Sequence, residues 1–187
     1  ALIAPADGGD IDEYSRAAIE HLASWNYQFA LDSTQTTLAV YWGEALMSAV
    51  RPLANAADKD LYDYLAQDVS DAQRLAALDS AMSTLTSGFG GWQVPWGEVN
   101  RYQRNDGAIV QQFDDSKPSL PVAFASARWG SLASFGARSY PGTNRLYGTS
   151  GNSFVAAVEF GERVRAKAVT QSYGGETYVG DFTTEVQ

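Results

Sequence analysis

The sequence contains no cysteine and only one histidine among its 187 residues. The lack of cysteine excludes disulfides, thiolate nucleophiles and cysteine-ligated metals, although it does not assign the protein to a compartment. A zinc site would have to draw almost all its ligands from carboxylates, because a single imidazole is available. We therefore expect no metal-binding residues.

Basic residues are also few, since 13 Lys and Arg stand against 22 Asp and Glu and give a net charge of −9. This balance disfavours nucleic acid and anionic membrane surfaces as partners. No apolar run approaches the roughly 20 residues that a membrane-spanning helix needs, so no membrane span is expected. The acidity is expected to keep the protein soluble.

The first part of the chain, residues 1–90, has the apolar periodicity of helices. Four helices are expected: one from a capping box of Asp10 and Glu13 past Leu22, one from Asp32 or Ser33 to a stop before Pro52, a short one within residues 55–64, and one from Ser70 or Asp71 to Gly88. The predicted buried stripes are Leu38, Trp42, Ala45, Leu46 and Ala49 in the second helix, and Leu75, Leu78, Met82 and Leu85 in the last.

The second part, residues 91–187, has the composition of strands and loops. Its expected elements are one or two helical turns over Trp96–Gln103 after Pro95, a turn at Asp106-Gly107, a polar loop over Asp114–Pro121, and strands at Phe154–Phe160, Val164–Gln171 and Tyr173–Phe182. Gly161-Glu162 is the predicted hairpin connection between the first two strands. The pattern predicts an α+β fold and a single unit over residues 1–187, with helices first and antiparallel strands last.

His21 would have to serve any Ser-His-Asp triad, because it is the only histidine. It lies in the middle of the first predicted helix, beside Leu22, and nothing in the sequence pairs it with a serine. We therefore assign His21 a structural or surface role.

Two glycine clusters resemble known loops without matching them. Gly148-Thr149-Ser150-Gly151-Asn152 has Asn152 where a nucleophile elbow needs its second glycine, and it precedes a strand, not a helix. We therefore expect Ser150 to be a turn residue that bonds to local backbone. Gly174-Gly175 is not followed by the Lys-Ser or Lys-Thr of a phosphate loop.

The tripeptide Trp-Gly-Glu occurs twice, at Trp42–Glu44 and at Trp96–Glu98. Paired carboxylates beside tryptophan would suit glycoside cleavage if Glu44 and Glu98 converged across a cleft. The other interpretation is that Trp42 belongs to an apolar helical stripe and that the repeat is a coincidence. Arg101 and Arg104, which follow Glu98, are expected to form exposed ion pairs on a helix.

Three ordered stretches resemble the later part of the large subunit of the penicillin acylase and acyl-homoserine-lactone acylase family. They are Trp25 with Asp32-Ser33 and the helix that contains Leu38 and Trp42, then Val94–Arg101, and then Ser150–Phe154 with Glu159–Gly161. One departure is that residues 171–181 lack the Ser-Pro-His sequence that such proteins usually carry after the last of these strands.

This resemblance implies a fragment of an αββα sandwich of the N-terminal-nucleophile hydrolases. The parent would hydrolyse the amide between an acyl group and an amine, without a metal or an organic cofactor. In that family the nucleophile is a serine at the free N-terminus of the large subunit, and its α-amino group acts as the base. Residue 1 here is Ala1, so no catalytic and no cofactor-binding residue is assigned to this chain.

The expected partner is therefore the rest of the acylase precursor, namely the small subunit and the N-terminal part of the large one. The resemblance also implies a periplasmic or extracellular location. An autonomous binding or scaffolding domain is the alternative, since the chain is long enough to fold alone. A glycoside hydrolase built on Glu44 and Glu98 is the third hypothesis.

Overall fold

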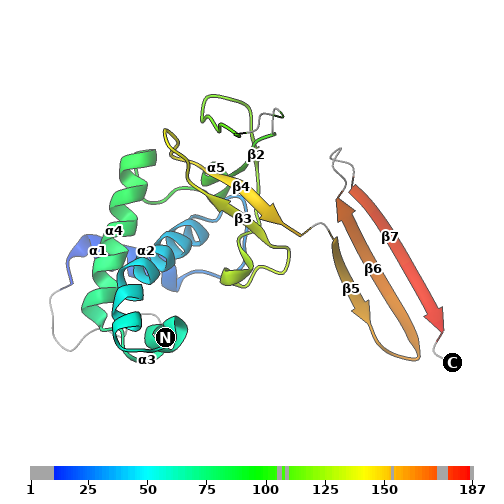
Figure 1. Cartoon of the computed structure of the whole chain (residues 1–187), viewed down its shortest axis with the longest axis horizontal. Helices are drawn as coiled ribbons and strands as arrows, with labels where there is room; N and C mark the ends of the chain where they lie inside the picture. Colours follow the sequence, from blue (N-terminus) through cyan, green and yellow to red (C-terminus); the bar gives the residue numbers. More distant parts are fainter. Residues whose placement is uncertain (1–10, 105–106, 108–109, 153, 172–176, 186–187) are drawn as a thin grey trace. The chain divides into compact units, whose positions relative to one another are not determined.

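The structure is a computed structural model that describes residues 11–104, 107, 110–152, 154–171 and 177–185. The chain divides into two compact units: unit 1 contains Ala1–Ala123 and Arg138–Tyr147, and unit 2 contains Phe124–Ala137 and Gly148–Gln187. Helices precede strands along the chain (Figure 1), which confirms the predicted α+β class. The prediction of one unit over residues 1–187 stays a prediction.

Unit 1 begins with the helices α1 (Glu13–Ala23), α2 (Thr34–Ala56), α3 (Leu61–Gln67), α4 (Asp71–Phe89) and α5 (Trp96–Val99). The first four helices each begin at a side chain that accepts a backbone N–H of the first turn: Asp12, Ser33, Asp60 and Ser70. Gly90 ends α4 in the left-handed conformation, with φ of 83°.

The start of α1 differs from the prediction. Asp10 lies outside the described residues, and Asp12 is the residue whose carboxylate accepts the N–H of Ser15. Glu13 is therefore the first helical residue and not the third residue of a capping box. The capping box of the structure is at α4, where Ser70 and Gln73 bond to each other's backbone N–H groups.

The predicted stop of the second helix before Pro52 is wrong, because α2 continues through Pro52 to Ala56. A proline inside a helix removes the hydrogen bond to the carbonyl four residues earlier. That carbonyl belongs to Ser48, which is exposed, so water can solvate it. The buried side chains of Val50 and Ala54, both 0% exposed, favour continuing the helix on the other side.

The short helix expected within residues 55–64 is displaced along the chain. Since α2 occupies the first of those residues, α3 begins only at Leu61, where the Asp60 carboxylate accepts the N–H groups of Tyr62 and Asp63. Its Leu61, Tyr64 and Leu65 pack against the core formed by α2 and α4.

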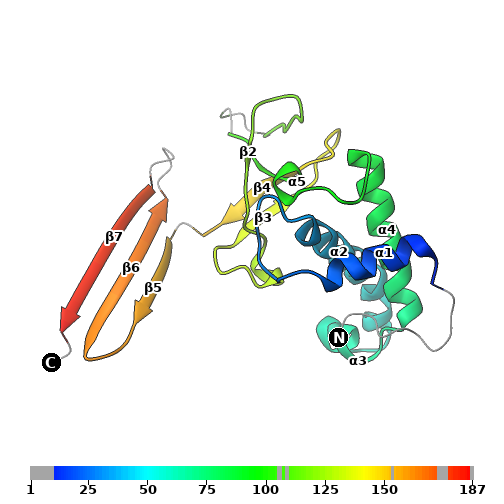
Figure 2. The ribbon, with the colours of Figure 1, turned by 180° about the vertical axis from the view of Figure 1, so that it is seen from behind.

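The core of unit 1 lies between α1, α2 and α4, which pack side by side (Figure 1 and Figure 2). Leu38, Leu78 and Leu85 are all 0% exposed, and complete burial of such a side chain contributes about 1.5–3 kcal/mol. The predicted stripe of α4 is confirmed at Leu78, Met82 and Leu85. In α2 the prediction holds for Leu38 and Leu46, whereas Ala49 is exposed.

The first sheet is mixed and has the strand order β2-β1-β4-β3. Its strands are β1 (Asn100–Tyr102), β2 (Leu120–Pro121), β3 (Phe135–Arg138) and β4 (Leu146–Gly151), and a short 3-10 helix, η1 (Ala127–Trp129), precedes β3. β1 runs antiparallel to β2 and parallel to the start of β4. The predicted helix over Trp96–Gln103 is therefore too long, because α5 ends at Val99 and β1 follows.

β3 and β4 were not predicted, because glycine is a poor strand former. Gly148 is required by a close approach across the strands: a Cβ on it would lie 2.3 Å from Cζ of Phe135. The aromatic ring thus occupies the space that a side chain on Gly148 would take. The expectation that Ser150 lies in a turn is wrong, since it is a residue of β4.

The second sheet, in unit 2, consists of β5 (Phe154–Glu159), β6 (Arg163–Gln171) and β7 (Thr177–Glu185) in that order. Both pairs are antiparallel, as predicted. The connection between β5 and β6 contains Phe160 besides the predicted Gly161-Glu162. β7 continues past the predicted end at Phe182 to Glu185, and residues 173–176 of the predicted strand lie outside the described residues.

Candidate functional site

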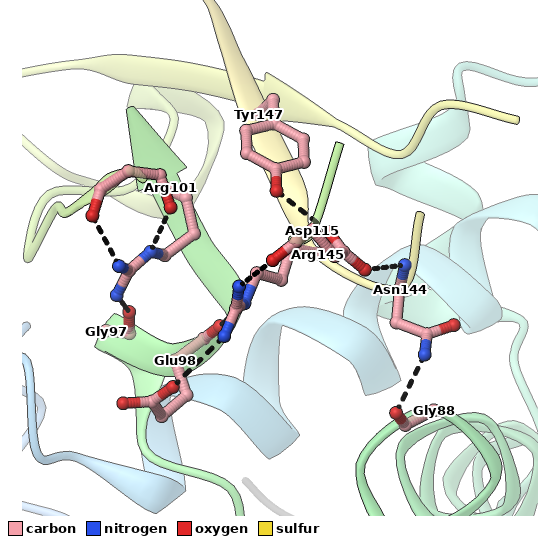
Figure 3. A network of polar contacts seen from close by, with 9 residues as sticks. Gly88, Gly97, Glu98, Arg101, Asp115, Asn144, Arg145 and Tyr147 are labelled. Atoms are coloured by element: carbon pink, nitrogen blue, oxygen red, sulfur yellow. Dashed lines mark hydrogen bonds and ion pairs between the residues drawn. The ribbon is translucent and has the colours of Figure 1, made fainter. Parts of the chain in front are cut away.

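A network of polar side chains joins loop 111–119 of unit 1 to α4, α5 and β4 (Figure 3). At its centre is Asp115. One carboxylate oxygen of Asp115 accepts the hydroxyl of Tyr147 at 2.8 Å, and the other accepts the backbone N–H of Asn144 at 2.7 Å. Both oxygens of this carboxylate are therefore used to hold the start of β4.

Tyr147 is completely buried, with 0% of its side chain exposed. Its ring stacks on Phe113, with centroids 4.9 Å apart and an interplanar angle of 12°. Burial, and after it the hydrogen bond to Asp115, raises the pKa of Tyr147 to about 12. At neutral pH the phenol is protonated, so it acts as a hydrogen-bond donor and not as a base.

Arg145 and Asn144 extend the network by bonding to backbone oxygens. Arg145 donates to the carbonyl of Asp115 at 2.8 Å and to that of Glu98 at 3.2 Å, and Asn144 donates from its side chain to the carbonyl of Gly88 at 3.0 Å. The ion pair between Arg145 and the Glu98 carboxylate is longer, at 3.6 Å. These contacts join segments far apart in sequence, so the geometry supports a structural function for the network.

Arg101 also has a structural role, and this corrects the prediction that it forms an exposed ion pair on a helix. It is a half-buried residue of β1 and donates to the hydroxyl of Ser119 at 3.0 Å, to the carbonyl of Ser119 at 2.6 Å and to the carbonyl of Gly97 at 2.8 Å. Arg104 is exposed and follows β1 outside any helix. The guanidinium of Arg101 thereby fastens β2 and α5 to β1.

His21 lies in the last turn of α1, where its Nε2 is 2.8 Å from the hydroxyl of Thr34 at the start of α2. Its ring also makes a T-shaped contact with Trp92, with centroids 5.3 Å apart. Burial lowers the pKa of the imidazole below its ordinary value. These contacts place His21 between two helices and the segment after α4.

Ser150 belongs to unit 2, whereas His21 belongs to unit 1. Ser150 is an exposed residue of β4 that lies beside Gly136 of β3, since a Cβ on that glycine would be 2.5 Å from the Ser150 hydroxyl oxygen. The other glycine pair considered above, Gly174-Gly175, lies outside the described residues.

The two Trp-Gly-Glu tripeptides lie on different helices, α2 and α5. Trp42 is half-buried and donates from its indole to the carbonyl of Arg74 at 2.9 Å, which gives it a role in helix packing. Glu44 and Glu98 are both exposed. This surface placement lacks the enclosed setting that a glycosidase acid requires.

One cleft was not predicted and lies between the start of α1 and α4, with a volume of about 400 Å³. Ser15, which is 3% exposed, is one of the residues that line it, and its hydroxyl oxygen lies 2.7 Å from Asp12 and 3.0 Å from Asp79. The bonds from the backbone and hydroxyl of Ser15 lower the pKa of Asp12. The spacing of Asp12 and Ser15 is typical of a helix cap. The third residue, Asp79, lies on α4, and no pattern in the sequence links it to the other two.

The described part of the chain contains no group of three or more His, Cys, Asp and Glu side chains placed to hold a metal ion. Among the same residues, no helix combines the length and the hydropathy needed to cross a bilayer.

A family model described as penicillin amidase matches residues 1–178. The chain belongs to the penicillin amidase family. The match covers most of the chain and confirms the resemblance carried by the ordered stretches from Trp25 to Gly161. A comparison with curated proteins gave no match. Membership indicates amide hydrolysis by the acylase to which such a chain contributes.

Proposed function

We propose that this chain is the C-terminal part of the large subunit of a penicillin-amidase-type acylase, and that it contributes structure and not the nucleophile. The observation that carries the proposal is the family match over residues 1–178. The acylase would cleave the amide that links an acyl group to an amine.

The use of the polar side chains in unit 1 supports a structural contribution. Asp115, Arg145 and Arg101 direct their polar atoms to backbone and to side chains of this unit, the buried Tyr147 among them. A catalytic group has to reach a substrate atom within hydrogen-bonding distance. Groups that already bond in this way instead hold loop 111–119, β2 and the start of β4 in place.

The nucleophile would then be a serine at the start of the large subunit, outside these residues, with its own α-amino group as base. No metal and no organic cofactor is needed for this chemistry. The partners would be the small subunit and the N-terminal part of the large subunit, and the assembled enzyme would act in the periplasm or outside the cell.

An assay of amide hydrolysis tests the proposal, with the full-length acylase and this chain compared on an acyl anilide that releases a coloured amine. The full-length protein should turn over and the chain alone should not. Ser150→Ala in the full-length protein is a control, because Ser150 is an exposed strand residue and its loss should leave kcat unchanged. Hydrolysis by the chain alone, or loss of turnover in Ser150→Ala, would place the nucleophile in this segment and overturn the proposal.

A further inference from the structure

Three aromatic side chains cluster in the loop between α1 and α2. The indole of Trp25 is the central ring, because its centroid lies 5.4 Å from that of Tyr27 and 6.2 Å from that of Phe29. Tyr27 is 67% exposed, and Trp25 and Phe29 are half-buried. Solvent and small ligands can therefore reach the cluster.

Hydrogen bonds within the loop hold these rings in a fixed arrangement. The indole N–H of Trp25 donates to the carbonyl of Gln28 at 3.2 Å, and the Asn26 side chain accepts the N–H of Gln28 at 2.9 Å. The end of the loop is attached to α5, since the carbonyl of Leu31 accepts the N–H of Gly97 at 2.7 Å. Rings positioned in advance in this way lose little conformational entropy when a ligand binds.

Tyr27 has a backbone conformation that is unfavourable for its side chain. Its φ is 61°, in the left-handed region that glycine and asparagine tolerate and bulky residues rarely adopt. Residues held in such conformations are concentrated at functional sites, where the surrounding structure imposes them. The ring of Tyr27 gains little burial in return, so the conformation serves to present this ring to solvent.

The planes of the three rings are inclined to one another. The interplanar angle is 45° between Trp25 and Tyr27 and 79° between Trp25 and Phe29. A flat ligand cannot stack on faces inclined in this way at the same time, whereas a compact, rounded group can touch more than one of them. The faces of aromatic rings carry negative potential, which attracts cations and above all methylated ammonium groups.

The charges near the loop also favour a cation. Residues 17–50 include Glu20, Asp32 and Glu44 but no Lys or Arg, and the whole chain has a net charge of −9. Within the described part of the chain, no Lys or Arg side chain lies over the rings of this cluster. The ring faces are thus free of cations from the chain itself, and the acidic surroundings raise the local concentration of cations from solution.

We infer that Trp25, Tyr27 and Phe29 bind a small soluble quaternary ammonium ion through cation–π contacts. The inference does not depend on the proposed amide hydrolysis, because it rests on the geometry and the charge of this loop alone. Contacts of this kind are weak where they are exposed to water, so we expect a Kd on the order of 1 mM.

A titration of the full-length protein with choline, followed by the NMR signal of the choline methyl protons, tests the inference. Methyl groups that lie over aromatic faces are shielded, so the signal should move upfield and the shift should saturate. The uncharged tert-butyl analogue of choline has the same shape without the charge and should bind about 10-fold more weakly. Equal affinity for the two ligands, or the lack of a saturable shift, would overturn the inference.

Substitutions of Tyr27 separate binding from folding. Tyr27→Asn removes the ring but suits the left-handed backbone, so its melting temperature should be no lower than that of the parent, and its affinity for choline should fall by about 3-fold. Tyr27→Phe keeps a ring and should retain most of the affinity. Tyr62→Asn is the matched control, because Tyr62 is also exposed, at 58%, but lies on α3. Unchanged affinity in Tyr27→Asn would contradict the inference.

Two further comparisons identify the source of the ammonium group and the accessibility of the loop. Choline that binds the 187-residue chain but not the full-length protein would show that the remaining polypeptide covers the rings, and this would refute the inference. Flotation with phosphatidylcholine vesicles, without any response to free choline, would assign the rings to a lipid headgroup and refute a soluble ligand. Binding of free choline to the full-length protein without flotation supports the inference.

Discussion

The helical layer of unit 1 and the second sheet of unit 2 differ in where their apolar side chains lie. Leu38, Leu78 and Val50 in the helical layer are all 0% exposed. By contrast, every side chain from residue 156 to residue 167 in β5, β6 and their connection is exposed or half-buried. The difference indicates that the helices carry their own hydrophobic stabilisation, whereas a small sheet depends on what covers it.

The largest expected difference in stability comes from replacing a leucine with alanine in each unit, because one of the two leucines is buried and the other is exposed. Leu78→Ala removes a fully buried side chain and should lower the free energy of unfolding by about 2–5 kcal/mol. Leu132→Ala, at a residue of unit 2 that is 95% exposed, should change it by less than about 0.5 kcal/mol. Urea denaturation followed by tryptophan fluorescence measures the change in the free energy of unfolding for both variants. Equal losses of stability in the two variants would contradict the difference in burial.

A smaller effect is expected where β3 and β4 meet. Gly148→Ala would place a Cβ 2.3 Å from Cζ of Phe135, and displacing that ring should cost about 1–3 kcal/mol. Gly161→Ala is the control, because its nearest atom would be 3.8 Å away. Phe135→Leu should recover part of the loss in the Gly148 variant. If the two glycine variants are equally stable in a thermal melt, the close approach does not constrain the fold.

Tyr147→Phe tests the polar network of unit 1. Loss of the 2.8 Å hydrogen bond to Asp115 should destabilise the protein by about 1–2 kcal/mol. Tyr62→Phe, at a residue that is 58% exposed, should have no measurable effect on chemical denaturation. A Tyr147 variant as stable as the parent would show that water replaces the phenol without loss.

The same residue predicts a dependence on alkaline pH. The pKa of Tyr147 is raised to about 12 from a usual value near 10, so its contribution is complete below pH 10 and is lost as the pH rises through 12. Burial raises the pKa of Tyr41 to about 12 as well, so Tyr41→Phe is a second test of the same argument. The decline in stability between pH 10 and 12 should be shallower in either variant than in the parent.

The smallest effect concerns His21. Because burial lowers the pKa of its imidazole, its contribution is present above the ordinary histidine pKa and is lost as the pH falls through the lowered value. The single histidine gives one imidazole signal in a proton NMR titration, whose midpoint should lie below 6.5. His21→Gln should flatten the fall in stability that begins as the pH drops below the ordinary histidine pKa. A midpoint above 6.5 would contradict the burial argument.

The helices were predictable because their signals are local. Spacing of three and four residues identifies the buried face of α4, and Ser70 with Gln73 lies at the spacing of a capping box. One exception is Pro52, which normally ends a helix. Its tolerance depends on the exposure of Ser48 and on the burial of Val50 and Ala54, and neither can be known from local sequence.

The first sheet and the polar network were not predictable, because distant residues define them. Tyr147 and Asp115 are 32 residues apart in the sequence. The close approach of the Phe135 ring to Gly148 leaves no periodic pattern in the sequence. Arg101 was expected on a helix, since a charge three residues after Glu98 is typical of one. Family membership was detectable in the sequence through the order of short motifs.

Mass and N-terminal sequence of the polypeptides in the purified acylase test the central claim most directly. The account predicts a processed large subunit that begins with serine and contains Ala1–Gln187 of this chain near its C-terminal end. A mature product that begins and ends close to these 187 residues would contradict it and would favour an autonomous binding domain.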